Sequence, residues 1–347
     1  MPLVTRHPLL LQTAFSELKR QAMEQPFFLV GTPGSVSIRI VNGRKFYYCQ
    51  FYDAQGKKSA EYLGALDAAT ACARAEEVAE QIAVTNTLIR DARLLAQRGY
   101  LRADTRTYAV LASIANHGLF RAGAVLVGSH AYAALQNELG AHGGALLTED
   151  VDIARGGSPL AIAPGRAEDF AEVLAESTVP LHPVPGLDPR SPATSYKVAG
   201  RDRFRVDLLT PTGGHEVTTR AIPELNARAT ALPYLGYLLD EPIDAVVLAR
   251  EGGVPVRVPR PEALAWHKML ASQLRRSTSE KKGKDALQAA VLFAVLAEQA
   301  PDALESAFAA LPRGGKSKTR SAAKQVILVL ESHAEDRAVE LMRTLVA

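Results

Sequence analysis

The chain has 347 residues, 47% of them hydrophobic, and a formal net charge of only +3. This length and hydrophobic content predict packed cores and two or three domains. The small net charge excludes a strong overall electrostatic field that would point to nucleic acid. Two cysteines, Cys49 and Cys72, supply neither a disulfide framework nor a zinc site, so we expect a cytoplasmic protein. The sequence contains no stretch of about 20 apolar residues, so we predict no membrane-spanning helix.

The first hundred residues are predicted to hold a small β unit between two helices. A three-stranded meander is predicted in residues 36–41, 44–52 and 58–63, because Asn42-Gly43 is a strong hairpin turn. The alanine-rich residues 67–97 predict a long helix after it. The helix before it, residues 8–24, would have an apolar stripe formed by Leu9, Leu10, Leu11, Phe15 and Leu18.

The second strand of this meander carries aromatic side chains on both faces. Phe46, Tyr48 and Tyr52 alternate there with Tyr47 and Phe51. Such rings, interleaved with basic residues, could stack bases and hold a phosphate backbone. A small sheet also needs aromatic residues for stability, with one face packed on helices, and we favour this second interpretation. The basic residues are Arg39, Arg44, Lys45, Lys57 and Lys58.

A Gly-Ser pair follows the first strand expected in the central part of the chain. Asp104 or Thr105 can cap a helix that runs through Ile114, and residues 123–127 then form an apolar strand. This strand ends at Gly128-Ser129, where a helical pattern begins. The backbone N–H groups at such a helix start can bind an anion, and glycine allows a close approach. Equally, Ser129 could be an ordinary N-cap.

Acidic residues lie on two later strand patterns. Asp150 and Asp152 are two residues apart, so their side chains leave the same face of an extended strand. Asp207 lies in an alternating run that places Arg205 and Asp207 on one side and Val206 on the other. If the strands pair, the three carboxylates would repel one another unless a cation neutralises them. Oxygen ligands of this kind favour Mg²⁺ or Mn²⁺. The acids could also be solvated charges on an edge strand.

The order of these parts resembles the polymerase-beta-like nucleotidyltransferase superfamily, most clearly over residues 105–290. The shared features are a strand, Gly-Ser, a helix, a strand with two spaced acids, and a later strand with one acid. The resemblance implies that Gly128 and Ser129 hold the nucleotide phosphates. It implies that Asp150, Asp152 and Asp207 are catalytic metal ligands, with Asp207 helping to activate the acceptor hydroxyl.

The C-terminal region carries basic residues to which the resemblance gives a role. In related enzymes a lysine on a helix here, followed by further basic residues, helps to bind the triphosphate. By position the phosphate-binding candidates are Lys268, Arg275, Lys281 and Lys284. Asp285 is interpreted as a structural charge near the start of the next helix. Two basic runs, residues 274–284 and 313–324, are more typical of solvated surfaces than of binding sites.

The predicted fold class is α+β, with a mixed-sheet nucleotidyltransferase core and a helical C-terminal region. The expected domains are residues 1–100, 101–258 and 259–347. The expected activity is metal-dependent transfer of a nucleoside monophosphate from an NTP to an acceptor hydroxyl. The acceptor could be RNA such as tRNA, a small molecule or a protein, and some related bacterial families are toxins. The alternative is a non-catalytic nucleic-acid-binding protein that uses the same fold.

Overall fold

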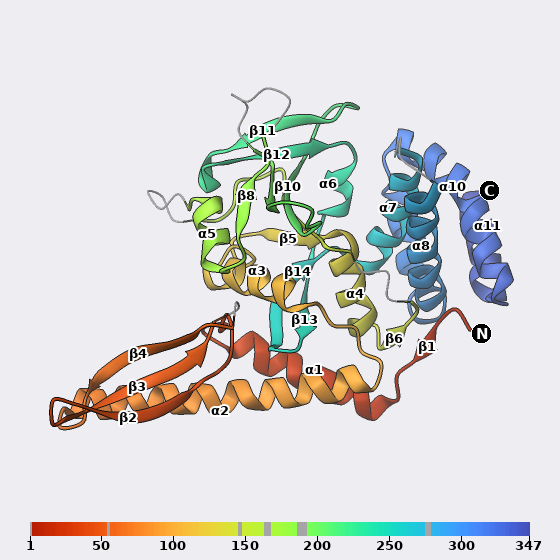
Figure 1. Cartoon of the computed structure of the whole chain (residues 1–347). Helices are drawn as coiled ribbons and strands as arrows, with labels where there is room; N and C mark the ends of the chain where they lie inside the picture. Colours follow the sequence, from red (N-terminus) through yellow and green to blue (C-terminus); the bar gives the residue numbers. More distant parts are fainter. Residues whose placement is uncertain (1, 54–55, 145–147, 163–167, 186–192, 275–278) are drawn as a thin grey trace.

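The computed structural model describes residues 2–53, 56–144, 148–162, 168–185, 193–274 and 279–347. Figure 1 shows a central body that contains the largest sheet, with an arm of strands and helix extending to the lower left. The C-terminal helices stand beside the body on the right. The predicted α+β class, with a mixed sheet and a helical C-terminal region, is confirmed.

The arm consists of an antiparallel meander and a long helix. Its turn is formed by Asn42 and Gly43, whose φ angles of 50° and 78° are the positive values that a tight hairpin of this kind requires. One face of the meander packs on the helix through Cys49, Leu63 and Ala75. The elements are β2 (Ser35–Val41), β3 (Arg44–Tyr52), β4 (Lys58–Ala65) and α2 (Ala69–Gln97).

The first helix, α1 (Leu9–Glu24), connects the arm to the body. Its buried side chains are Phe15, Leu18 and Ala22, which pack in one cluster with residues of α2 and of a later hairpin. The expected apolar stripe is therefore only partly correct, because Leu9 and Leu10 are 77% and 79% exposed. The buried face of the helix is therefore not the face on which Leu9 and Leu10 lie.

The central sheet has seven strands, and both parallel and antiparallel neighbours occur in it. Strand β10 lies beside β7 and β12 in parallel and beside β9 in antiparallel orientation. Strands β9 and β10 form an antiparallel hairpin. The order along the main path is β11 (Thr218–Ile222), β12 (Ala227–Leu232), β10 (Arg205–Pro211), β7 (Asp150–Arg155) and β5 (Ala124–Val127), with β9 (Ser195–Val198) and β8 (Leu181–Pro183) beside β10.

Helices and a second hairpin surround this sheet. The side chain of Asp104 accepts hydrogen bonds from the N–H groups of Arg106 and Thr107 and so caps α3, as predicted. Helix α4 packs against β5, β7 and the β13–β14 hairpin. The bounds are α3 (Thr105–Asn116), α4 (Gly128–Glu138), α5 (Phe170–Glu176), a 3-10 turn (Pro223–Leu225), α6 (Leu235–Leu238), β13 (Ile243–Ala249) and β14 (Gly252–Val258), with a short pair formed by β1 (Thr5–Arg6) and β6 (Ala141–His142).

The C-terminal helices share a hydrophobic core with the sheet. Trp266 is fully buried between Phe293 and Phe308, and its indole N–H donates a hydrogen bond to the Leu304 carbonyl. No helix in the described part of the chain is long and apolar enough to cross a membrane. The helices are α7 (Pro261–Leu274), α8 (Ser279–Gln299), α9 (Pro301–Ala309), α10 (Arg313–Ser332) and α11 (Asp336–Val346).

Candidate active site

The sheet register brings the three predicted acids to one face of the central sheet. Asp207 of β10 lies directly beside Asp152 of β7, and Arg205 lies beside Asp150. Alternate residues of β10, beginning with Val206, are buried, as the sequence pattern predicted. The residues between them, which include Arg205 and Asp207, face the site. The condition under which the three carboxylates come together, namely that β7 and β10 pair with each other, is therefore met.

The Gly-Ser element lies directly against these acids. Val127, the last residue of β5, pairs with Asp152, and α4 begins at the next residue, Gly128. Gly128 has a φ of +71°, and a Cβ at this position would overlap Asp152 Oδ2. Ser129 is buried at 7% exposure. The start of α4 therefore directs its backbone toward the carboxylates, which only glycine permits at residue 128.

Two further side chains complete this face of the sheet. Arg205 Nε lies 3.1 Å from Asp150 Oδ1 and 3.1 Å from Asp207 Oδ2, so one guanidinium group contacts both acids. Ser195 of β9 pairs with Asp207 in the sheet, and its hydroxyl donates a hydrogen bond of 2.5 Å to Asp207 Oδ1. The sequence placed Arg205 on the same side of its strand as Asp207 but gave it no role. Ser195 was missed because the sequence does not determine the register in which β9 pairs with β10.

Burial, together with the nearness of like charges, raises the pKa values of two of these acids. Burial and repulsion by Asp207 raise the pKa of Asp152 to about 7, and Asp150 adds to this rise. The positive charges of Lys268 and Arg205 act on Asp152 in the opposite direction. Burial also raises the pKa of Asp207, although the Ser195 hydrogen bond and Arg205 oppose the rise. The site would therefore be stabilised by additional positive charge.

The donor chemistry of the site fits a hard divalent cation. Carboxylate oxygens of Asp150, Asp152 and Asp207 are the ligand type that Mg²⁺ and Mn²⁺ prefer. Among the described residues, no group of three or more His, Cys, Asp or Glu side chains is gathered closely enough to hold a metal ion. Arg205, which contacts two of the acids, supplies their counter-charge instead. A cation bound by these carboxylates would compete with the Arg205 guanidinium.

Basic residues of the C-terminal helices reach the same site. Lys268 of α7 acts electrostatically on Asp152, and Lys281 of α8 acts on Asp207. Lys268 is buried, and its ammonium group lies 3.3 Å from Asp285 Oδ1. Asp285 is thus a buried partner of Lys268 within α8, and its interpretation as a charge at a helix start is wrong, because α8 begins at Ser279. Arg275, the remaining predicted phosphate ligand, lies outside the described residues.

Residues 105–312, more than half of the chain, match the family described as nucleotidyltransferase. The chain belongs to this nucleotidyltransferase family. No curated protein and no solved structure matches it. The family match spans the Gly-Ser element, the three acids and helices α7 and α8, so the resemblance seen in the sequence is confirmed. The protein is therefore an enzyme of nucleotidyl transfer, and its substrate is an NTP.

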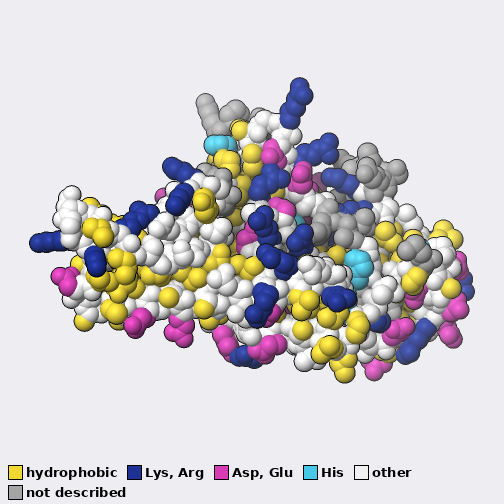
Figure 2. All heavy atoms as spheres, turned by 60° about the horizontal axis from the view of Figure 1, so that its bottom comes forward, with side chains coloured by type: hydrophobic (Ala, Val, Ile, Leu, Met, Phe, Trp, Pro, Cys, Tyr) yellow, Lys and Arg dark blue, Asp and Glu magenta, His cyan; other side chains and the backbone are white. Residues whose placement is uncertain are grey.

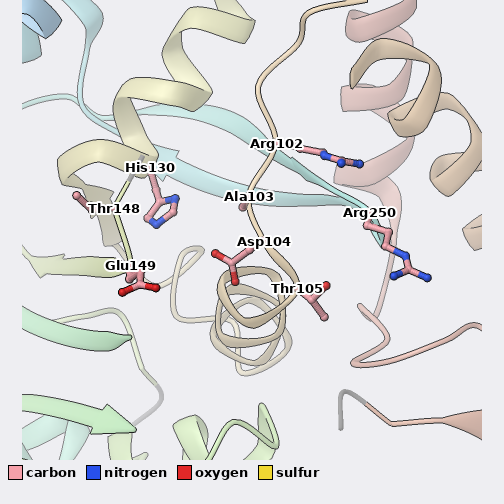
Figure 3. A pocket seen from close by; sticks show the side chains of 8 residues that line it. All are labelled: Arg102, Ala103, Asp104, Thr105, His130, Thr148, Glu149 and Arg250. Atoms are coloured by element: carbon pink, nitrogen blue, oxygen red, sulfur yellow. The ribbon is translucent and has the colours of Figure 1, made fainter. Parts of the chain in front are cut away.

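A pocket of about 510 Å³ is lined by Glu149, the residue before Asp150, and by His130, two residues after Gly128, although none of the three acids lines it. Figure 3 shows the ring of His130 and the carboxylates of Asp104 and Glu149 on one side, with Arg102 and Arg250 extending on the other. His130 is the third residue of α4 and is only 2% exposed, and burial lowers the pKa of its ring. Its Nε2 has no hydrogen-bond partner within the described structure. Sequence analysis missed this pocket, because its walls come from segments that are distant along the chain.

Proposed function

We propose that this nucleotidyltransferase uses divalent metal ions to transfer a nucleoside monophosphate from an NTP to an acceptor hydroxyl. The observation that carries the proposal is the sheet register, in which Asp207 lies beside Asp152 and the start of α4 lies against Asp152. The acids then lie on one face of the sheet, next to a helix N-terminus. This combination can hold a triphosphate and the cations that accompany it.

Each residue of the site has a role in this proposal. The backbone at Gly128 and Ser129 would hold phosphate oxygens at the start of α4. Asp150, Asp152 and Asp207 would hold Mg²⁺ or Mn²⁺, which neutralises the charge that develops on the phosphate oxygens during an in-line displacement. Ser195 would fix the orientation of Asp207, since it holds one of the two carboxylate oxygens.

The reaction itself is a displacement at the α-phosphorus. The acceptor oxygen forms a bond to that phosphorus, and the bond to the bridging oxygen of the β-phosphate breaks, so that pyrophosphate leaves. Asp207 would accept the hydroxyl proton at Oδ2, because Oδ1 accepts the hydrogen bond from Ser195 and a cation bound by the acids would displace the Arg205 guanidinium from Oδ2. The raised pKa of Asp207 favours this proton transfer. Positioning and charge neutralisation supply the rest of the rate.

The basic residues would hold the triphosphate on the side of the C-terminal helices. Lys268 and Lys281 influence the acids electrostatically, and Lys284 influences His130. Arg275 is assigned to the same task by its place in the sequence. A lysine at this position can neutralise phosphate charge as a point cation.

We place the acceptor in the pocket of Figure 3. Its lining residues come from the start of α3 and the segment before it, from α4, from the segment that leads into β7 and from the turn between β13 and β14. Among the described residues, none of those that line it belongs to α7 or α8. The triphosphate and the acceptor would thus approach the acids from different sides. A volume of about 510 Å³ is suitable for a small polar group, such as one nucleoside of a larger acceptor. RNA is the acceptor class that we propose.

Labelled nucleotide transfer tests the function directly. Wild-type protein is incubated with each α-³²P-labelled NTP, with Mg²⁺ or Mn²⁺ and with total cellular RNA. A variant with Asp150→Ala and Asp152→Ala is compared with it, and Asp302→Ala, an exposed acid of α9, is the control. We expect label in RNA with wild type and Asp302→Ala only.

The same reactions distinguish the acceptor classes. Label in protein, or in a small-molecule extract used in place of RNA, would show that the acceptor is not RNA. The proposed transfer reaction would be unchanged. Equal labelling by wild type and the double variant would overturn the metal-site assignment. Label that appears equally with and without EDTA would overturn the metal requirement.

A further inference from the structure

The small sheet of the arm has one face that is not needed for packing. Its inner face is covered by α2, which contacts Tyr47, Cys49, Phe51 and Leu63. Because side chains alternate along a strand, the neighbouring residues Phe46 and Tyr48 and their cross-strand partners point to the other face. We call this side the outer face. It is defined by residues 35, 37, 39 and 41 of β2, 44, 46, 48, 50 and 52 of β3, and 58, 60 and 62 of β4.

Aromatic rings form a connected group on the outer face. The centroids of Tyr48 and Tyr62 are 5.6 Å apart, and those of Phe46 and Tyr62 are 5.8 Å apart. Tyr62 is nevertheless 51% exposed, and Tyr52, on the same face, is 48% exposed. Rings that contact one another and yet remain open to solvent offer flat surfaces on which further rings can stack.

The charges on the outer face have one sign. Arg39, Arg44 and Lys58 lie on the outer face, and no position of this face holds Asp or Glu. The guanidinium group of Arg39 lies over the Tyr48 ring at 5.0 Å. The acid in these strands, Glu61, belongs to the opposite face, where it pairs with Arg74 of α2 at 2.7 Å. The outer face is therefore complementary to an anion.

We propose that the outer face of the β2–β4 sheet binds single-stranded nucleic acid. Bases would stack on Tyr48, Tyr62 and Phe46, while phosphates would contact Arg39 and Lys58. A single strand is favoured over a duplex, because only unpaired bases expose the flat faces that these rings can contact. An open antiparallel sheet with aromatic residues at neighbouring positions is a well-suited platform for this purpose.

The arm is accessible for such a ligand. Figure 1 shows it extending away from the central body. Figure 2 shows Lys and Arg side chains beside hydrophobic ones on the visible side of the arm, with Asp and Glu side chains at its lower edge. Binding here requires none of the three carboxylates. The inference is thus independent of the proposed chemistry, and a protein without transfer activity would still bind.

Fluorescence anisotropy of the full chain tests the proposal without NTP and in EDTA, so that no transfer occurs. The probes are a labelled 12-nucleotide RNA, a DNA of the same sequence and the matching DNA duplex. We expect both single strands to bind more tightly than the duplex. Tyr48→Ala and Tyr62→Ala should each raise the Kd for the single strands about 5-fold to 150-fold, the effect of losing one stacked base.

Matched controls separate stacking from other effects. Phe27 is also 51% exposed but lies before the sheet, so Phe27→Ala should leave the Kd unchanged. Tyr62→Leu keeps an apolar side chain in the sheet but has no ring. Its Kd should rise as much as that of Tyr62→Ala, and it replaces Tyr62→Ala in the test if the alanine variant does not fold. Arg39→Gln and Lys58→Gln should lower the slope of log Kd against log salt by about 0.7 each, whereas Arg90→Gln on α2 should not.

Three results would overturn the inference. The first is equal binding by wild type, Tyr48→Ala and Tyr62→Leu, and the second is preference for the duplex. The third is that the wild-type protein binds no nucleic acid and instead forms a dimer in light scattering, while Tyr62→Leu is a monomer. That result would assign the outer face to a second copy of the chain. A preference between the RNA and the DNA probe would identify which single strand the face selects.

Discussion

Gly128 and Asp152 leave no space between them, because a Cβ on residue 128 would overlap Asp152 Oδ2. Gly128 also has a φ of +71°, a conformation that other residues adopt only with strain. The glycine therefore serves two purposes. It permits the turn from β5 into α4, and it brings the start of this helix into contact with an acid of the site.

Gly128→Ala should reduce transfer at least about 100-fold, since the displaced Asp152 carboxylate would lose its alignment with the other acids. Gly43→Ala is a matched control, because Gly43 has a φ of +78° and no neighbouring atom within 4 Å. The control should lose about 1 kcal/mol of stability from backbone strain and keep its activity. Urea unfolding and transfer rates of both variants check this. Wild-type rates in Gly128→Ala would contradict the assignment.

Ser195→Ala should weaken the binding of Mg²⁺ to the enzyme. The Ser195 hydroxyl holds Asp207 Oδ1, and a hydrogen bond to a charged group contributes about 1.5–3 kcal/mol. We expect kcat to fall about 10-fold and the Mg²⁺ concentration for half-maximal rate to rise, while Ser195→Thr stays close to wild type. If the hydroxyl only stabilised β9, thermal stability would fall and the half-maximal Mg²⁺ concentration would not change.

Local pattern was sufficient for the parts of the site that lie on single strands. The alternation around Asp207 predicts its face correctly, since burial of Val206 and Leu208 decides which side of β10 turns inward. The turn at Asn42-Gly43 was equally clear. These features depend on residues within a few positions of one another.

Long-range packing was not accessible in the same way. Ser195 reaches Asp207 only because β9 pairs with β10 in one register, and Lys268 meets Asp285 only because α7 packs on α8. The partners in each pair are too far apart in the chain for periodicity to connect them. Leu9 and Leu10 show the opposite case, in which a clear apolar pattern did not decide the buried face.

His130→Phe should raise the KM for the acceptor at least about 10-fold and leave the KM for NTP unchanged. His130 lines the pocket with a buried ring, so a benzyl group retains the volume but removes both ring nitrogens. His182→Phe, at an exposed position of β8, is the control. Steady-state kinetics with each substrate varied in turn provides the measurement. A rise in the KM for NTP alone would assign the pocket to the nucleotide.

His117 should make folding stability depend on pH. Its two ring nitrogens lie 2.9 Å from carboxylates of Glu168 and Glu176. Burial alone would lower its pKa, but these hydrogen bonds outweigh burial and raise the pKa above 6.5. A raised pKa means that the folded protein binds the proton more tightly, so the stabilisation is fully present below pH 6.5 and is lost as pH rises through the folded pKa.

Chemical unfolding of His117→Gln at several pH values checks this prediction. The variant should be less stable than wild type by about 1 kcal/mol at pH 6, the size expected for a partly exposed pair. The difference should shrink at pH 8.5, where the imidazole is neutral. A difference that is the same at both pH values would show that His117 contributes by packing alone.

Lys268 has both a structural partner and a proposed role in catalysis, and a double variant can separate them. Lys268 and Asp285 are buried, with 7% and 3% of their side chains exposed, and their charged atoms are 3.3 Å apart. Lys268→Met alone would remove the ammonium group that lies beside the buried Asp285 carboxylate and should cost about 3–5 kcal/mol. Adding Asp285→Leu removes that carboxylate and should restore most of the stability.

The kinetics of this stable double variant decide the role of Lys268. Its positive charge acts on Asp152 across the site, so its loss should weaken triphosphate binding as well as the ion pair. We therefore expect the KM for NTP in Lys268→Met/Asp285→Leu to remain at least about 10-fold above wild type, which corresponds to 1.4 kcal/mol of binding. Recovery of the wild-type KM together with stability would make Lys268 a structural residue, and the triphosphate would then depend on the lysines of α8.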